Sequence, residues 1–350
     1  MFNNHPLEIT LYVRLLINAV NLKKVTMINH LHIETHSFFG LKSGPKVLVL
    51  GRVHGNECCG TLAIKNVINL IQNQLVNITL GKVTFVPITN PLAAIKGTRN
   101  GDRNLNRAFY PKGSNKKDFE DELNDILCPI LEESDVLLDL HSFLNGVEPF
   151  ALIGNTSGEE KAFTVNQEKI YTSESHLVSA LEVDTVIANW SETYTRGVKN
   201  RRKRDGVLSP PFSLNYDEKY GDGTTEYARS KGALAITLEC GQHEDVSAPS
   251  VGENAILNIL DCLRMTKERP NSLAINRKIN YISLFDVIDK ISHGDKFIKN
   301  WKTFMKIEKN EIIGISERGK ELRAPKDCFM VFPNQNAEPG QEWFYLGEQS

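Results

Sequence analysis

The sequence predicts an α/β protein with a largely parallel central sheet, followed by a small all-β part. Two observations lead to this fold class. Between residues 46 and 264, short β-branched apolar runs alternate with segments of helical periodicity, a pattern typical of parallel sheets covered by helices. From about residue 278 the pattern changes to short strand-like runs separated by Gly- and Pro-containing turns, which indicates all-β structure.

The first half of the chain predicts three strands and two helices. In order, these are a buried strand at 46–51 (KVLVLG), a helix at 61–75, a strand at 82–91 that Pro91 stops, a polar loop at 97–111, a helix at 118–132 and a strand at 134–142. In such sheets the functional residues lie where strands end and loops begin. His54, Arg99 and His141 all lie just past a predicted strand.

The second half begins with less regular sequence. Residues 155–225 are polar and predict irregular structure. Their basic run at 201–204 is interpreted as a solvated loop rather than a nucleic-acid patch, with a flexible loop over the site as a further alternative. Residues 224–241 then predict a helix, a glycine turn and a strand, and an amphipathic helix follows at 251–264. The segment ERPNSL at 268–273 is the expected linker to the β part.

Composition restricts the setting and the partners. The formal net charge of −2 gives no general attraction to nucleic acid or to an anionic membrane surface. Six dispersed cysteines without a CxxC pair favour a reducing, cytoplasmic location. The apolar patch within residues 1–26 is too short and too interrupted to span a bilayer and lacks the features of a signal peptide. We assign no function to this N-terminal extension, and the sequence leaves a homo-oligomer open.

The first chemical signal is His54-Gly55-Asn56-Glu57. A histidine and a glutamate three residues apart can reach one cation when the chain turns between them, and both are good zinc ligands. HxxE is common by chance, so a surface turn leading into a helix is the alternative. Its position between a buried strand and an amphipathic helix favours the metal site.

The second signal is His141, at the end of the strand that also carries Asp139. A catalytic zinc needs three protein ligands and an open position, and His141 supplies the third. A buried, hydrogen-bonded histidine is the alternative. Asp139 lies on the same face of the strand, where it would orient His141 or simply cap a neighbouring loop.

The third signal is Glu239, which ends the apolar strand AITLE. A carboxylate there is unfavourable unless it has a partner or a function. Near zinc it would take a proton from water and give it to a leaving amine, whereas a structural salt bridge is the alternative.

The fourth signal is the loop that carries Arg99, Asn106 and Arg107. Arginine forks match carboxylates and oxyanions, so arginines beside a metal indicate an anionic substrate. A solvated basic loop, neutralised by Asp102 and nearby acids, is the alternative.

Together, and in this order, the motifs VLVLGRVHGNECCG, NPLAAIKGTRNGDRNLNRAFYP, VLLDLHS and AITLECG resemble the succinylglutamate desuccinylase/aspartoacylase family, a branch of the zinc carboxypeptidase-like hydrolases. The resemblance covers about residues 40–265, and the closing EPGQEWFYLGE is similar to the family's small β domain. It implies a catalytic domain at 27–268 with a central mixed, mostly parallel sheet, and a β domain at 278–350.

The resemblance also implies roles for single residues. His54, Glu57 and His141 match the ligands of one zinc ion per chain, and Glu239 matches the general base and acid. Arg99 matches the arginine that polarises the scissile carbonyl and steadies the oxyanion. Asn106 and Arg107 match a pair that grips a substrate carboxylate. The implied reaction is attack of zinc-activated water on an amide carbonyl, followed by release of an amine.

Some positions depart from the family pattern. Asn104 stands where the family often has Asp, and Tyr110 separates Phe109 from Pro111. Further substrate-binding arginine and tyrosine residues are not fixed by the motifs. The candidates for them are Tyr194, Arg196, Tyr227 and Arg229.

Three functions are carried forward. The first is a zinc-dependent deacylase that cleaves the amide bond of a small anionic N-acyl amino acid or similar compound. The second is a zinc carboxypeptidase acting on short or cell-wall peptides, since the same residues would serve it. The third, of another class, is a non-catalytic binding protein on the same fold; the presence of Glu239 and all three metal ligands speaks against it.

Overall fold

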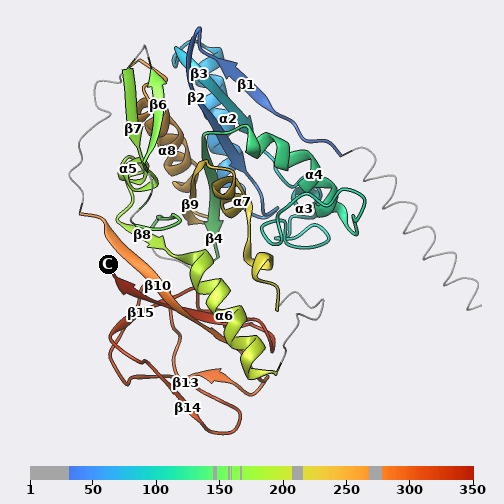
Figure 1. Ribbon diagram of the computed structural model, residues 1–350, viewed down its shortest axis with the longest axis vertical. Helices are drawn as coiled ribbons and strands as arrows, with labels where there is room; N and C mark the ends of the chain where they lie inside the picture. Colours follow the sequence, from blue (N-terminus) through green and yellow to red (C-terminus); the bar gives the residue numbers. More distant parts are fainter. Residues whose placement is uncertain are drawn as a thin grey trace, which may run out of the picture.

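The computed structural model describes residues 31–144, 148–156, 158, 160–165, 168–206, 216–267 and 278–350 (Figure 1). The N-terminal extension at 1–26 and the expected linker at 268–273 lie outside these residues. None of the described helices is both long enough and apolar enough to cross a membrane.

One large mixed sheet runs through the molecule. Its strand order is β1-β3-β2-β4-β9-β5-β8-β10-β16-β15-β12. Neighbours are parallel from β3 to β9 and again from β5 to β10, whereas β5 is antiparallel to β9 and the strands beyond β10 pair in antiparallel fashion. The strands of this sheet are β1 (His36–Phe39), β2 (Lys42–Gly51), β3 (Leu80–Val86), β4 (Val136–Phe143), β5 (Phe150–Leu152), β8 (Thr185–Ala188), β9 (Leu234–Gln242), β10 (Asn280–Asp289), β12 (Lys306–Ile307), β15 (Cys328–Val331) and β16 (Glu342–Gln349).

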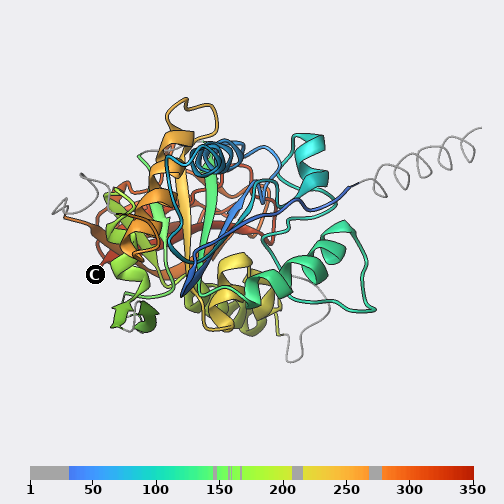
Figure 2. The same cartoon turned by 90° about the horizontal axis from the view of Figure 1, so that it is seen from above.

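Helices cover both faces of the parallel part (Figure 2). Strand β2 explains why, because its alternate side chains are buried on opposite sides of the sheet. Val47 and Val49 pack in a core with α2 (Cys59–Gln72) and α8 (Ala248–Cys262). Leu48 and Leu50 pack in a second core with α4 (Phe119–Glu132) and α7 (Thr224–Ser230). A strand buried on both faces has a continuous apolar sequence, which is why the run KVLVLG predicts a buried strand. The predicted α/β fold class is confirmed.

The prediction of a strand over 82–91 is wrong at its end. Strand β3 ends at Val86, and Pro91 begins the short helix α3 (Pro91–Lys96) instead of only stopping a strand. The Asn90 side chain caps this helix by accepting a hydrogen bond from the Ala93 N–H. Proline at the first helical position has no N–H to leave unsatisfied.

The prediction that 155–225 is irregular is also wrong. This region contains β6 (Lys161–Val165) and β7 (Glu168–Thr172), which form a two-stranded sheet, and α5 (Glu174–Ser179), β8 and α6 (Trp190–Arg204), followed by the 3-10 helix η2 (Glu218–Gly221). The polar composition gave no clear periodic pattern here; α6, for example, has few apolar residues.

The basic run at 201–204 is the last turn of α6 rather than a solvated loop. Arg201 is only 2% exposed. Its guanidinium contacts Asp289 on β10 and Glu342 on β16, and these distant acids stabilise the buried charge.

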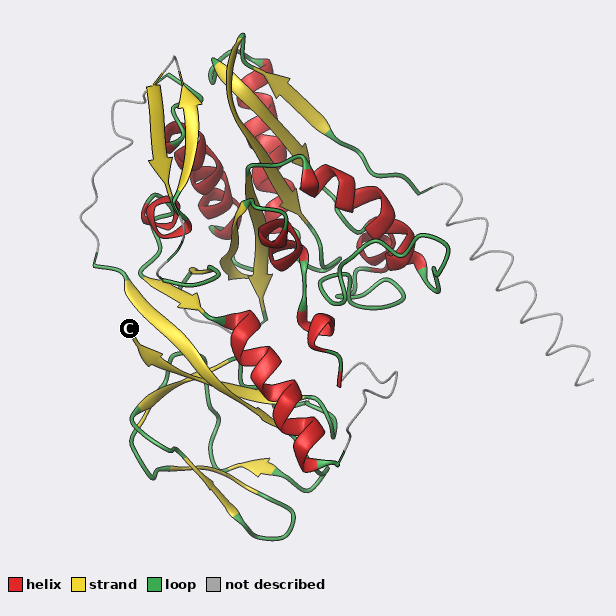
Figure 3. Cartoon of the chain, viewed as in Figure 1, coloured by secondary structure: helices red, strands yellow, loops and turns green. Residues whose placement is uncertain are grey.

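The C-terminal strands continue the main sheet (Figure 3). Strand β10 pairs with β8 in parallel, from Asn280 opposite Thr185 to Ser283 opposite Ala188. A separate three-stranded sheet contains β11 (Lys296–Phe297), β13 (Ile312–Ile315) and β14 (Glu321–Arg323). The division into domains at 27–268 and 278–350 stays a prediction.

Candidate active site

The candidate site lies where three adjacent parallel strands end. Strands β2, β4 and β9 are neighbours, so their carboxyl ends meet at one edge of the sheet. In the register of β4 and β9, His141 lies directly opposite Glu239. The loop after β2 brings His54 and Glu57 to the same edge. Residues far apart in sequence therefore meet because of the strand register.

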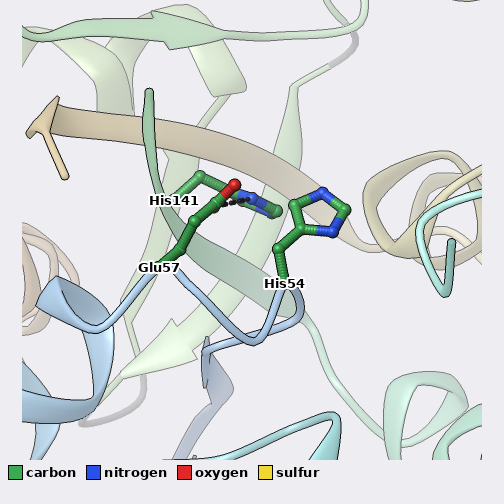
Figure 4. A group of neighbouring side chains, drawn as sticks. All are labelled: His54, Glu57 and His141. Atoms are coloured by element: carbon green, nitrogen blue, oxygen red, sulfur yellow. Dashed lines mark hydrogen bonds and ion pairs between the residues drawn. The ribbon is translucent and has the colours of Figure 1, made fainter. Parts of the chain in front are cut away.

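His54, Glu57 and His141 form a possible metal site (Figure 4). One ligand-type atom from each lies within 4.8 Å of the other two, and all three side chains are buried. The turn between the first two is closed by a hydrogen bond from the Glu57 N–H to the His54 carbonyl, 3.1 Å long. Gly55 is required here, because a Cβ at this position would lie 1.9 Å from the Ala93 carbonyl oxygen.

The protonation of His54 suits a metal ligand. Its side chain is 1% exposed, and its Nδ1 atom has no hydrogen-bond partner among the described residues. Burial, together with the nearby positive charge of Arg99, holds the pKa of His54 well below 6.5. A neutral imidazole with an unpartnered buried nitrogen is the form that binds zinc.

His141 is held between two carboxylates. Its Nδ1 lies 2.9 Å from Glu57 Oε2, and its Nε2 lies 3.1 Å from Asp139 Oδ2. Burial by itself would lower the pKa of His141, but Asp139 and Glu57 outweigh it and raise that pKa well above 6.5. A positive charge is therefore favourable beside these carboxylates, whether it is a proton on His141 or a bound cation. The two imidazoles, the Glu57 carboxylate and the unpartnered Nδ1 of His54 thus fit a metal ion.

Asp139 orients the imidazole and also contacts a helix. Besides its contact with His141, it accepts a hydrogen bond from the Thr224 hydroxyl at the start of α7. The Asp139 Oδ2 atom therefore contacts both the imidazole of His141 and the first residue of α7. Such a partner fixes which ring nitrogen of a ligating histidine faces the metal.

Glu239 presents an unpartnered carboxylate oxygen beside these residues. Its Oε2 atom is buried and forms no hydrogen bond within the described part of the chain. Burial, followed by repulsion from Glu57, raises the pKa of Glu239 to about 7. An orphaned carboxylate whose pKa lies close to neutrality is typical of a general base, and no salt bridge occupies it among the described residues.

Arg99 reaches the metal ligands from the loop after α3. Its Nη1 atom lies 3.1 Å from Glu57 Oε1, and its side chain is 53% exposed. A guanidinium carries five donors, so further N–H groups remain for an oxyanion.

Asn106 and Arg107 make different contacts: Asn106 bonds to the start of α7, and Arg107 lies over an aromatic ring. Asn106 Oδ1 accepts a hydrogen bond from the Thr224 N–H, 2.9 Å long, which leaves its amide group to donate. Arg107 Nη1 donates a hydrogen bond to the Asn106 carbonyl, and the Arg107 guanidinium lies 5.4 Å from the centre of the Trp190 ring. Apart from Glu57, the sequence-predicted site residues line one cavity of about 570 Å³; they are His54, Arg99, Asn106, Arg107, His141 and Glu239.

Three further residues, Asn56, Ser142 and His243, hold the site together through hydrogen bonds, and the sequence did not predict this role. His243 Nδ1 lies 2.8 Å from the Ser142 hydroxyl, and its Nε2 lies 3.2 Å from Asn56 Nδ2. The Ser142 N–H donates to Glu57 Oε2 at 3.2 Å. His243 therefore connects both ligand-bearing segments. Its place four residues after Glu239, beyond a strand end, was the available signal.

The cavity distinguishes between the four candidates for additional substrate binding. Arg229 lines it, whereas Tyr194, Arg196 and Tyr227 do not. Arg229 is held by Glu174, with Nε 2.8 Å from Oε1. Of the positions that depart from the family pattern, Asn104 accepts a hydrogen bond from the Asn106 N–H, so it shapes the loop that carries Arg107.

Comparison with known proteins gives a consistent relationship. Residues 43–189 match the family model described as succinylglutamate desuccinylase/aspartoacylase catalytic domain. An aspartoacylase of Danio rerio is 34% identical over 113 residues, which is 29% of this chain and 35% of that protein. The alignment thus spans about a third of the length of that curated relative. The family resemblance predicted from the motifs is confirmed.

Solved structures share the fold over nearly the whole chain. A succinylglutamate desuccinylase/aspartoacylase from Rhodobacter sphaeroides has a TM-score of 0.62 at 16% identity, covering 91% of this chain and 90% of that one. A succinylglutamate desuccinylase from Vibrio cholerae has a TM-score of 0.64 at 18% identity, covering 90% and 85%. At these identities the likeness concerns the fold alone.

Proposed function

We propose that this relative of the succinylglutamate desuccinylase/aspartoacylase family is a zinc-dependent hydrolase that deacylates a small N-acyl amino acid or similar amide. The observation that carries the proposal is one constellation. The ligand-type atoms of His54, Glu57 and His141 lie within 4.8 Å of one another, and an unpartnered oxygen of Glu239 is buried beside them.

The residues divide the chemistry between them. His54, Glu57 and His141 would hold zinc, which when bound polarises a carbonyl and lowers the pKa of water. Glu239 accepts the proton of the attacking water and returns it to the leaving amine, so that protons balance over one turnover. Arg99 donates to the carbonyl oxygen as it becomes negative.

Substrate binding falls to the Asn106-Arg107 pair. Asn106 and Arg107 line a cavity of about 570 Å³, a size typical of small-molecule sites. Thr303, Phe332 and Tyr345, all from the C-terminal strands and their loops, line the same cavity. This enclosure favours a small substrate over the alternative, a peptide cleaved by a carboxypeptidase.

The proposal is tested by metal content and hydrolysis together. Purified protein is expected to contain about one zinc per chain, and a chelator should abolish hydrolysis of N-acetyl and N-succinyl amino acids until zinc is restored. His141→Ala should lose the metal, whereas His293→Ala, which removes an 81% exposed imidazole, should keep it. Protein that binds no zinc and hydrolyses no amide would rule the proposal out, and short peptides in the same panel would reveal a carboxypeptidase.

Replacing Arg107 tests the carboxylate-binding role. Arg107→Ala should raise KM for N-acyl amino acids by about 10- to 100-fold, as expected for loss of a charge-assisted hydrogen bond. The corresponding amino-acid amides, which lack the carboxylate, should change little. Arg318→Ala, at an exposed arginine, serves as the charge-matched control. Equal losses on acids and amides would refute this role.

A further inference from the structure

Resting on the function proposed above, we propose that the cavity selects N-acyl amino acids with one carboxylate and a large apolar side chain, best an aromatic one. Two independent observations lead there. Aromatic rings line one wall of the cavity, and among the described residues that line it Arg107 is the arginine that no carboxylate contacts.

The aromatic wall is formed by five rings from separate segments. Its members are Phe143 at the end of β4, Phe150 on β5, Trp190 at the start of α6, Phe332 just after β15 and Tyr345 on β16. Successive ring centroids lie 5.7 Å apart for Phe143–Phe150 and 6.1 Å for Phe150–Phe332. The wall continues at 6.1 Å from Phe332 to Trp190 and at 4.8 Å from Trp190 to Tyr345. These distances are typical of favourable aromatic pairs.

The backbone of Phe332 is strained, and the surrounding contacts hold the residue in place. Its φ angle is +50°, an outlier for a bulky residue. The Phe332 N–H donates to the Thr303 hydroxyl at 3.2 Å, and the ring packs between Phe150 and Trp190. Strain of this kind persists where the surroundings over-determine it, and it concentrates at ligand sites.

The charges around the cavity exclude a second substrate carboxylate. Arg229 is neutralised by Glu174 at 2.8 Å and Glu226 at 3.5 Å, and Arg99 is engaged with Glu57. Among the described residues lining the cavity, Arg107 is the arginine that no carboxylate contacts. Because Glu226 and Glu342 also line the cavity, a second substrate carboxylate would meet like charge without an arginine of its own, which is unfavourable.

Arg107 connects the carboxylate site with the aromatic wall. Its guanidinium lies over Trp190, 5.4 Å from the ring centre, so a carboxylate bound there stands next to the aromatic wall. The carboxylate and the apolar group therefore belong to the same half of the substrate, which is the amino-acid half. An aromatic side chain would extend the line of rings.

The test compares substrates on the zinc-loaded full chain. N-acetyl-L-phenylalanine and N-acetyl-L-leucine are expected to exceed N-acetylglycine in kcat/KM by about 10- to 100-fold, and N-acetyl-L-aspartate should be the poorest. Phe332→Ala and Trp190→Phe should lower kcat/KM more for N-acetyl-L-phenylalanine than for N-acetylglycine, and should thereby reduce this preference. Phe39→Ala, at a 68% exposed ring on the edge strand β1, should change nothing. A preference for aspartate, or equal losses on all substrates, would overturn the inference.

A binding measurement separates this inference from the proposed function. The free amino acids are the products, so L-phenylalanine should raise the Tm of the zinc-loaded protein more than L-aspartate does. Phe332→Ala should remove that difference. If no N-acyl amino acid is hydrolysed yet this difference is found, the deacylase function fails and the specificity stands. If L-aspartate stabilises more, the specificity fails whatever the activity.

Discussion

Glu239→Gln is expected to lower kcat for amide hydrolysis by about 10²- to 10⁴-fold, the contribution typical of a general base. Glutamine keeps the size of the side chain but cannot take up a proton. Because Glu239 is not one of the three ligand-type residues, zinc content should remain at the level of the unaltered protein. Glu244→Gln, at an exposed acid on the following loop, is the matched control. Loss of zinc in Glu239→Gln, or an unchanged kcat, would contradict the role.

The same residue sets the pH dependence. Glu239 must be ionised to act as a base, so activity should fall as the pH decreases through its pKa. That pKa is raised to about 7 by burial and by Glu57 in the metal-free protein, and a bound cation will lower it. We therefore expect the acidic limb at or below about pH 7, and its absence from the residual activity of Glu239→Gln.

The raised pKa also has a consequence for stability. In the unfolded chain Glu239 would titrate near its ordinary 4.5, so the folded metal-free protein holds the ionised form less favourably. This destabilisation is absent below the unfolded pKa, grows as the pH rises and is complete above about 7. Glu239→Gln should accordingly raise the Tm of the metal-free protein at pH 8, and the gain should vanish near pH 4.

Arg201→Met should destabilise the protein by about 3–5 kcal/mol, the cost typical of breaking a buried ion pair. Arg201 is 2% exposed, with Nε 2.8 Å from Asp289 Oδ2 and Nη2 3.1 Å from Glu342 Oε1. Methionine would fill the space but leave Asp289 buried. Arg204 Nη1 lies 3.4 Å from the same oxygen, so the loss should lie toward the lower end of that range.

Urea denaturation measures this loss. Arg204→Met, which removes a 44% exposed guanidinium, should cost no more than about 1 kcal/mol, with an unchanged m value in both variants. If both variants lost the same free energy of unfolding, the buried ion pairs of Arg201 would not stabilise the protein more than the exposed pairs of Arg204 do. Because Glu342 and Tyr345 share β16 and line the cavity, Arg201→Met should also weaken binding of apolar amino acids.

Much of the site was predictable from the sequence, because its residues follow apolar strands. The run VLVL fixed β2, and the parallel register then placed Glu239 opposite His141. Arg201 was not predictable, since its partner Asp289 lies 88 positions along the chain. The aromatic wall was missed for a similar reason: its rings come from five segments, and no local pattern marks which aromatic residues will face one cavity.

The continuity of the sheet across β8, β10 and β16 has a consequence for dynamics. Two parts of a protein joined by a flexible connection commonly open and close over a ligand by a hinge motion. Here the strands that carry the two sides of the cavity belong to one hydrogen-bonded ladder, and a hinge would have to break it. Substrate entry must therefore depend on movements of side chains and loops at the mouth, and the backbone amides of β8 and β10 should exchange with solvent slowly during turnover.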